Sequence, residues 1–150
     1  MKKIALATLL ALAVGSASAV ELGVQGLRDY SGNPDRNGFG VTLGQKFDKV
    51  GVTAGFERFT KGSNDLDRYT LTAGYDVAKF GAVTITPKVG VAYLNPETTR
   101  NGWAGTVGVG ASYPVTKQVA LTADYAYQKG NNITKAYNGN IITTGVKYTF

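Results

Sequence analysis

Side chains that could carry out chemistry are scarce in this chain. The sequence has no histidine and no cysteine. A serine nucleophile usually needs a histidine to accept its proton near neutral pH, and transition-metal sites are mostly built from histidine and cysteine. The serines beyond the amino-terminal segment are Ser31, Ser63 and Ser112. We therefore expect a non-enzymatic protein with no catalytic residues, no metal ligands and no cofactor.

Asp65 and Asp67, with Asn64 beside them, are the best-spaced candidates for a calcium site. Their spacing is too short and incomplete for an EF-hand loop, and acids in an exposed turn are usually just solvated. The glycines between Gly102 and Gly110 lie along an apolar stretch rather than at the strand-to-helix junction that a nucleotide-binding loop needs. Neither segment predicts a ligand.

Period-two alternation begins at Val20 and continues along the chain. Clusters of Gly, Asn, Asp, Pro and Ser interrupt it, a pattern typical of strands and turns. Alternately short and long connections, with strands of about ten residues, are typical of outer-membrane barrels. The predicted strands are 20–30, 38–47, 50–59, 68–78, 82–94, 103–113, 118–128 and 141–150.

One face of these strands is apolar and carries most of the aromatic residues. A soluble barrel with an apolar interior would show the same alternation, but an eight-stranded interior is too narrow for so many rings. The rings also gather near the strand ends, where amphipathic side chains favour both membrane interfaces. They are Tyr30, Phe39, Tyr69, Tyr93, Trp103 and Tyr127 toward the long loops, and Phe47, Tyr113, Tyr148 and Phe150 toward the short turns.

We therefore predict an all-β fold, an eight-stranded antiparallel up-and-down transmembrane β-barrel with its apolar face toward lipid. The first strand must pair with the last, because an open edge in hydrocarbon would leave backbone groups unpaired. Pro87 cannot donate to the ladder and predicts a bulge or distorted pairing. The short turns are expected at Asp48-Lys49, Lys79-Phe80-Gly81 and 114–117.

The opposite face predicts a charge network in the lumen among Thr, Gly and Ala. Isolated charges there would be costly, so we expect pairs that fill the bore: Glu21 with Lys46 and Lys147, Glu57 with Arg68, and Lys88 with Asp124. A narrow conducting path lined by the same residues is the alternative, although open channels are typical of wider barrels. The predicted network comprises Glu21, Asp29, Lys46, Glu57, Arg68, Asp76, Lys88, Asp124 and Lys147.

Arg28 and Arg58 fall on the lipid-facing side, close to the long loops. Guanidinium groups at this depth could bind the phosphates of lipopolysaccharide. The simpler interpretation is that these long cations reach toward water past the apolar surface. Both interpretations remain open at this point.

The first nineteen residues resemble a secretory signal peptide. Lys2 and Lys3 precede the apolar stretch Ile4 to Val14, and small residues follow up to Ala19. Cleavage after Ala19 would leave 20–150 as a single barrel domain with a net charge of about +4. The basic residues are scattered rather than gathered on one face, so no nucleic-acid binding is expected.

The ending Tyr148-Thr149-Phe150 follows Val146, Thr144 and Ile142 at alternate positions. This pattern resembles the assembly signal of the small eight-stranded outer-membrane proteins of Gram-negative bacteria, which include opacity-like proteins, the barrel domain of outer-membrane protein A, and OmpX. The resemblance covers 20–150. It implies an integral outer-membrane protein whose Val146, Tyr148 and Phe150 are read by the barrel-assembly machinery, after delivery by periplasmic chaperones.

The resemblance also implies a monomer that contacts outer-membrane lipid and lipopolysaccharide, with a structural or surface-interaction role in the envelope. A small porin-like channel is one alternative. Another is an adhesin that acts through the extracellular loops, above all the longest, 129–140, which contains Lys135 and Tyr137. The predicted extracellular loops are 31–37, 60–67, 95–102 and 129–140.

Overall fold

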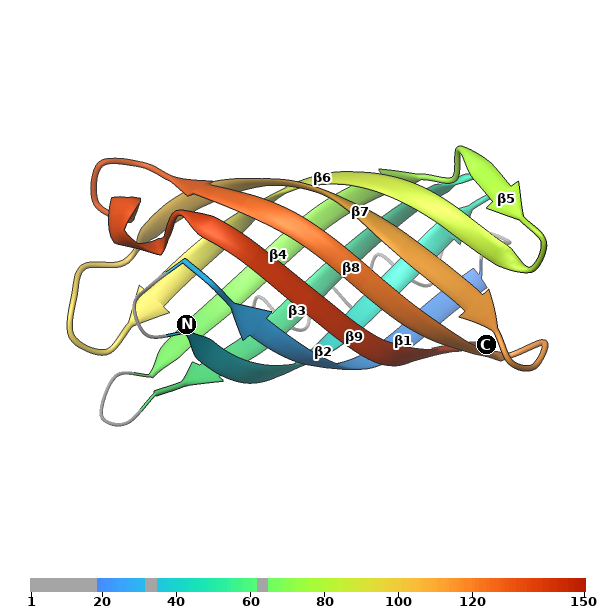
Figure 1. Ribbon diagram of the computed structural model, residues 1–150, viewed down its shortest axis with the longest axis horizontal. Helices are drawn as coiled ribbons and strands as arrows, with labels where there is room; N and C mark the ends of the chain where they lie inside the picture. The colour runs from blue at the N-terminus through green and yellow to red at the C-terminus, as the bar shows by residue number, and fades with distance from the viewer. Residues whose placement is uncertain (1–18, 32–34, 62–64) are drawn as a thin grey trace.

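The computed structural model describes residues 19–31, 35–61 and 65–150; the expected signal peptide therefore lies almost wholly outside the described residues. Antiparallel strands follow one another along the chain and close into a tilted barrel (Figure 1). The strands are β1 (Ala19–Asp29), β2 (Arg36–Phe47), β3 (Val50–Thr60), β4 (Leu66–Tyr75), β5 (Ala78–Phe80), β6 (Val83–Pro96), β7 (Gly102–Pro114), β8 (Val119–Gly130) and β9 (Gly139–Thr149).

The long strands β1 to β4 and β6 to β9 form the wall, and each pairs with its neighbour in sequence. The barrel closes where β1 pairs antiparallel with β9, from Glu21 opposite Thr149 to Asp29 opposite Ile141. Closure satisfies the backbone groups that an open edge would leave exposed to hydrocarbon. The predicted closed, eight-stranded antiparallel fold is confirmed.

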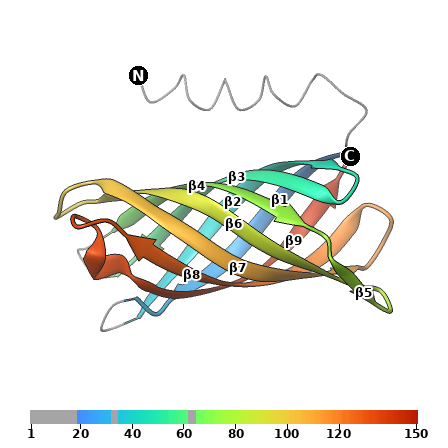
Figure 2. The same ribbon diagram turned by 90° about the horizontal axis from the view of Figure 1, so that it is seen from above.

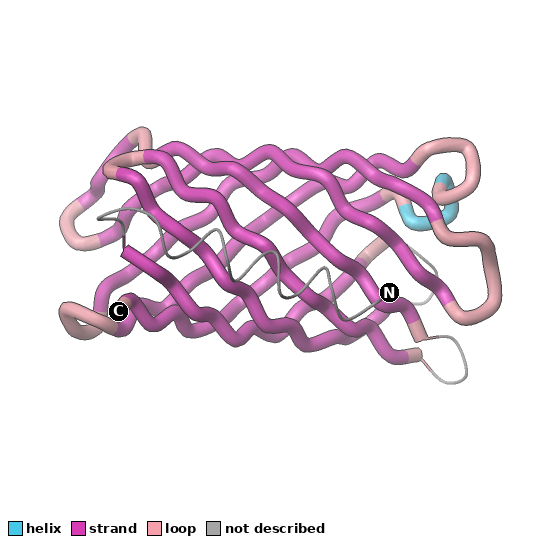
Figure 3. The backbone as a smooth tube through the Cα atoms, turned by 180° about the vertical axis from the view of Figure 1, so that it is seen from behind, coloured by secondary structure: helices cyan, strands magenta, loops and turns pink. Residues whose placement is uncertain are grey.

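Connections at one end of the barrel are short, and those at the other end are longer (Figure 3). The Asp48-Lys49 turn is found as predicted, because Phe47 pairs with Val50. The turn predicted at Lys79-Phe80-Gly81 is wrong in detail, since Lys79 and Phe80 still pair with β6. The chain turns at Gly81 and Ala82 instead, and the φ of +60° at Gly81 suits glycine.

Pro87 lies beside a bulge, as predicted. β4 pairs with β6 as far as Gly74 opposite Lys88, and the ladder resumes with Ala78 of β5 opposite Ile85. The three residues between Gly74 and Ala78 therefore face only two residues of β6, Thr86 and Pro87. The proline sits where the ladder with β4 has already been interrupted, so its missing donor costs little.

The outward side chains are apolar, and many are about half exposed, including Leu22, Val89 and Leu121. The aromatic girdles lie where the sequence places them, and rings contact one another within each: Tyr93 and Trp103 have centroids 5.2 Å apart at the long-loop end, and Tyr148 and Phe150 4.9 Å apart at the other. An apolar outer surface this extensive fits lipid rather than water.

Helical structure among the described residues includes one 3-10 turn, η2 (Lys135–Tyr137), in the loop between β8 and β9 (Figures 1 and 3). Within residues 19–31, 35–61 and 65–150, no helix has the length and apolar character needed to cross a bilayer.

Candidate functional site

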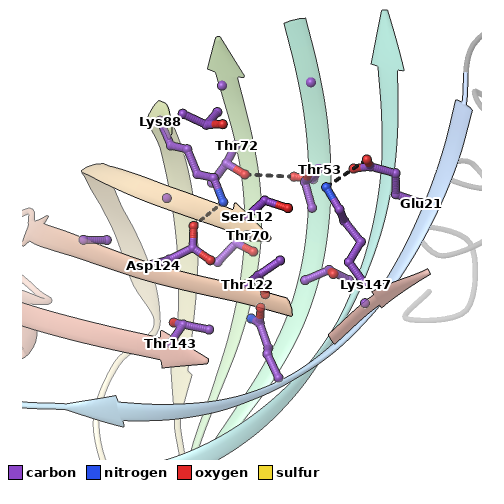
Figure 4. A pocket seen from close by; sticks show the side chains of 18 of the residues that line it. Glu21, Thr53, Thr70, Thr72, Lys88, Ser112, Thr122, Asp124, Thr143 and Lys147 are labelled. Carbon is purple, nitrogen blue, oxygen red and sulfur yellow. Dashed lines mark hydrogen bonds and ion pairs between the residues drawn. The ribbon is translucent and has the colours of Figure 1, made fainter. Parts of the chain in front are cut away.

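The lumen contains a polar cavity of about 180 Å³, named the polar chamber below. Residues from all the long strands line it, and most of them are threonines or charged residues, because the inward positions of each strand alternate with the lipid-facing ones. Figure 4 shows Thr53, Thr72 and Ser112 among the charged side chains that line the chamber. The chamber reaches toward the short-turn end, where Glu21, Lys46 and Lys147 line it.

Three ion pairs cross the polar chamber. Lys147 binds Glu21 at 2.9 Å, and Lys88 binds Asp124, so both of these predicted pairs form (Figure 4). The predicted nearness of Lys46 to Glu21 does not lead to a pair. Lys46 instead contacts Asp76 at 2.5 Å.

The bulge beside Pro87 explains this change of partner. Asp76 follows the end of β4 within the bulge, where its side chain accepts a hydrogen bond of 2.7 Å from the Thr86 hydroxyl as well as the bond from Lys46.

A buried ion pair marks the inner limit of the chamber. Arg68 and Glu57 are register partners on β4 and β3, and their side chains are 3.2 Å apart and 6% exposed each. The Gln25 amide also donates to Glu57, at 3.0 Å. This predicted pair is confirmed, and it lies deeper than the three pairs of the chamber, whose lysines are 26–39% exposed.

Asp29 faces the lumen but does not join the predicted ion-pair network. It is almost fully buried, accepts a hydrogen bond of 2.8 Å from the Ser31 backbone N–H, and makes no ion pair with another described residue. Arg36, its register partner on β2, stacks over the Tyr137 ring at 4.8 Å instead.

The long-loop end of the lumen contains a buried apolar cluster, which the sequence prediction of a polar bore missed. Phe59 and Leu94 have no exposed surface, Leu66 has 1% and Ile141 has 2%. These side chains come from different strands and meet inside the barrel above the Glu57–Arg68 pair. This apolar plug comprises Leu27, Phe59, Leu66, Ala92, Leu94, Ala104, Tyr137 and Ile141.

Tyr137 is the member of the plug that comes from a loop. The short turn η2 directs its ring inward, where the hydroxyl lies 3.1 Å from the Thr99 hydroxyl. The Gln128 amide donates to the Tyr137 carbonyl at 2.9 Å, and Asn138 accepts from the Gly130 backbone N–H at 2.6 Å. The ring predicted as part of an adhesive surface is therefore buried beneath the loop.

A signal for the plug was present in the sequence. On β3, β4 and β9 the inward positions change from charge or threonine to a large apolar residue close to the long loops: Glu57 to Phe59, Arg68 to Leu66 and Thr143 to Ile141. Alternation shows that these residues face inward, but only the register brings them to a common height.

Arg28 and Arg58 lie on the outer face, as predicted, and each meets at least one acid in or beside a neighbouring long loop. Arg28 binds Asp35 at 3.2 Å, and Arg58 lies 3.5 Å from both Asp65 and Asp67. The two acids considered for calcium therefore hold a guanidinium group. Among the described residues, no group of three or more His, Cys, Asp or Glu side chains is placed to hold a metal ion.

Residues 4–150 match the family described as the outer membrane protein beta-barrel domain. No curated protein is significantly similar to the sequence.

Several solved structures share the fold. Neisserial surface protein A is 19% identical, with a TM-score of 0.66 over 90% of this chain and 98% of that one. Ail, the attachment invasion locus protein of Yersinia pestis, in complex with the heparin analogue sucrose octasulfate, is 18% identical, with a TM-score of 0.60 over 89% and 97%. OprG of Pseudomonas aeruginosa is 13% identical, with a TM-score of 0.58 over 89% and 95%. At these identities the likeness concerns the fold alone.

Proposed function

This chain belongs to the outer membrane protein beta-barrel domain family, and on that premise we propose that it is a closed, non-enzymatic barrel with a structural or surface-interaction role in the Gram-negative envelope. The apolar plug is the observation that supports this proposal most directly. Phe59, Leu66, Leu94 and Ile141 expose 2% of their surface or less, so water and hydrated ions meet an apolar barrier at the long-loop end. The polar chamber below it is then a blind cavity.

The chemistry of the chamber supports the same role. Its acids and bases neutralise one another in pairs, and this arrangement stabilises a packed interior rather than selecting one sign of ion. The deepest pair, Glu57 with Arg68, lies against the plug, so the lumen closes by charge pairing and by apolar packing at successive depths. Small barrels are generally filled by side chains in this way.

Conductance measurements in planar bilayers test whether the lumen is closed to ions. The purified wild-type protein is expected to give no steady unitary currents. A double variant, Phe59→Ser with Leu94→Ser, is expected to admit water and to show openings, because polar side chains would wet the barrier. Reproducible wild-type openings that change in Glu57→Ala or Lys88→Ala would instead establish the porin-like alternative.

A surface-interaction role through the loop after β8 is the second candidate. Ile133, 52% exposed, and the exposed Lys135 point outward while Tyr137 is turned in, so the loop has a defined outer surface. Ail has been solved with a heparin analogue, and a sulfated polysaccharide is the corresponding probe for this chain.

Replacement of the whole loop would also remove Tyr137 from the plug. The sharper variant is Ile133→Ser with Lys135→Glu, compared with Lys117→Glu at the opposite end. Cells that carry the wild-type barrel should bind immobilised heparin, and only the loop variant should lose this binding. Unchanged binding would contradict the adhesive role. Increased detergent sensitivity of a deletion strain, restored equally by both variants, would support the structural one.

A further inference from the structure

Each of the three short connections carries an exposed lysine that no described residue neutralises. Lys49 lies in the turn between β2 and β3, Lys79 lies on β5 beside the Gly81 turn, and Lys117 lies in the turn between β7 and β8. None of them makes an ion pair with another described residue. Asp48 is the one acid at the tips of these connections, all of which belong to the described part of the chain. This lysine rim, Lys49, Lys79 and Lys117, is a ring of unmatched positive charge.

Cations elsewhere on the wall are placed differently. In the lumen, Lys46, Lys88 and Lys147 each contact a carboxylate. On the outer face near the long loops, Arg28 and Arg58 are matched by loop acids. These five cations each meet an acid of the protein, whereas the three rim lysines meet none among the described residues and can bind an anion outside it.

Apolar side chains set the depth of the lysine rim in the bilayer. Phe47 is 46% exposed, Phe80 is 70% exposed and Val115 is 55% exposed, and each lies within two residues of a rim lysine. The hairpin of β5 and β6 carries Lys79 and Phe80 to its tip at the short-turn end (Figure 2). An aromatic ring at this level fits the membrane interface, and a lysine stem carries its ammonium group outward to the headgroups.

We propose that the lysine rim binds the anionic headgroups of phospholipids in the leaflet that faces the periplasm. Short turns of outer-membrane barrels lie on that side, and ammonium groups near an anionic surface each raise the affinity roughly fivefold. The inference rests on the placement of the barrel in the outer membrane. It does not depend on whether the lumen conducts or the loops adhere.

Competitive lipid retention tests the proposal. The full folded protein is equilibrated in mixed micelles with equal amounts of phosphatidylglycerol and phosphatidylcholine, and the lipids that remain bound are counted by native mass spectrometry. The wild type should retain phosphatidylglycerol in preference, and added salt should weaken the preference, because salt screens exposed charges. The triple variant Lys49→Gln, Lys79→Gln, Lys117→Gln should lose it.

A variant with the same loss of charge at the other end is the matched control. Arg100→Gln, Lys129→Gln, Lys135→Gln should keep the wild-type preference, because these residues lie at the long loops. Equal preference in the rim variant and the wild type would overturn the proposal, as would an equal loss in both triple variants. Folding is checked by heat-modifiable mobility in gels. The single variants, each expected to lower the preference roughly fivefold, keep the test available if the triple variant does not fold.

Discussion

At the long-loop end of the lumen most of the buried inward side chains are apolar, whereas toward the short turns the inward side chains are largely charged and partly exposed to solvent. Phe59 has no exposed surface, while the Lys88 side chain is 39% exposed. Both regions use inward positions of the same strands. The difference teaches that the inside of this barrel is not one environment: one end is closed by a buried apolar cluster, and the other contains a cavity lined by paired charges.

The Glu57–Arg68 pair lies at the border of the two regions, and breaking it is expected to have the largest effect on stability. Glu57→Ala would leave the Arg68 guanidinium buried without its partner, and we expect a loss of about 3 to 5 kcal/mol in the free energy of unfolding. Urea titration of the folded barrel in micelles, read by gel mobility, measures it. The double variant Glu57→Leu with Arg68→Met should recover most of the loss; no recovery would show that the charges themselves are needed.

Phe59→Ala compares the contribution of a ring in the apolar plug with that of a ring on the lipid-facing surface of the same barrel. Removal of this fully buried ring should leave a cavity and lower the free energy of unfolding by about 3 kcal/mol. Phe39→Ala is the matched control, because Phe39 is 58% exposed and lipid chains can fill the vacated space. The same urea titration applies to both, and equal losses would mean that the plug is not tightly packed.

Lys88→Ala compares an ion pair of the polar chamber with the buried Glu57–Arg68 pair at its border. The Lys88–Asp124 pair is partly exposed to solvent, so its removal should lower the free energy of unfolding by about 1 kcal/mol or less. A loss as large as that of Glu57→Ala would contradict the distinction between the two regions. The two variants are best measured side by side in one micelle preparation.

Arg58→Gln has the smallest expected effect, below about 0.5 kcal/mol, because its contacts with Asp65 and Asp67 are long and exposed. The double variant Arg28→Ala with Arg58→Ala then tests the predicted contact with lipopolysaccharide. Binding of lipopolysaccharide by this variant at the wild-type level, with unchanged folding, would exclude a specific role for these two arginines.

The chamber could be predicted from the sequence better than the plug. Opposite charges at inward positions predict Glu57 with Arg68, which lie on paired strands, and Lys88 with Asp124, which lie on either side of β7; both pairs form. The partner of Lys46 could not be predicted, since the bulge beside Pro87 brings in Asp76. A proline within a predicted strand indicates a bulge. The direction in which the side chains of the bulge point, however, depends on the strand pairing around it.

The sequence alone determined the strands, the two faces and the closed barrel, because the side chains of a strand alternate between faces and an open edge cannot persist in lipid. Only the tertiary structure decided that Leu27, Phe59, Leu66, Leu94 and Ile141 meet at one height, and that Tyr137 turns in to join them. The reason is physical: the tilt and stagger of the strands set which inward residues share a level, and no local pattern encodes that stagger.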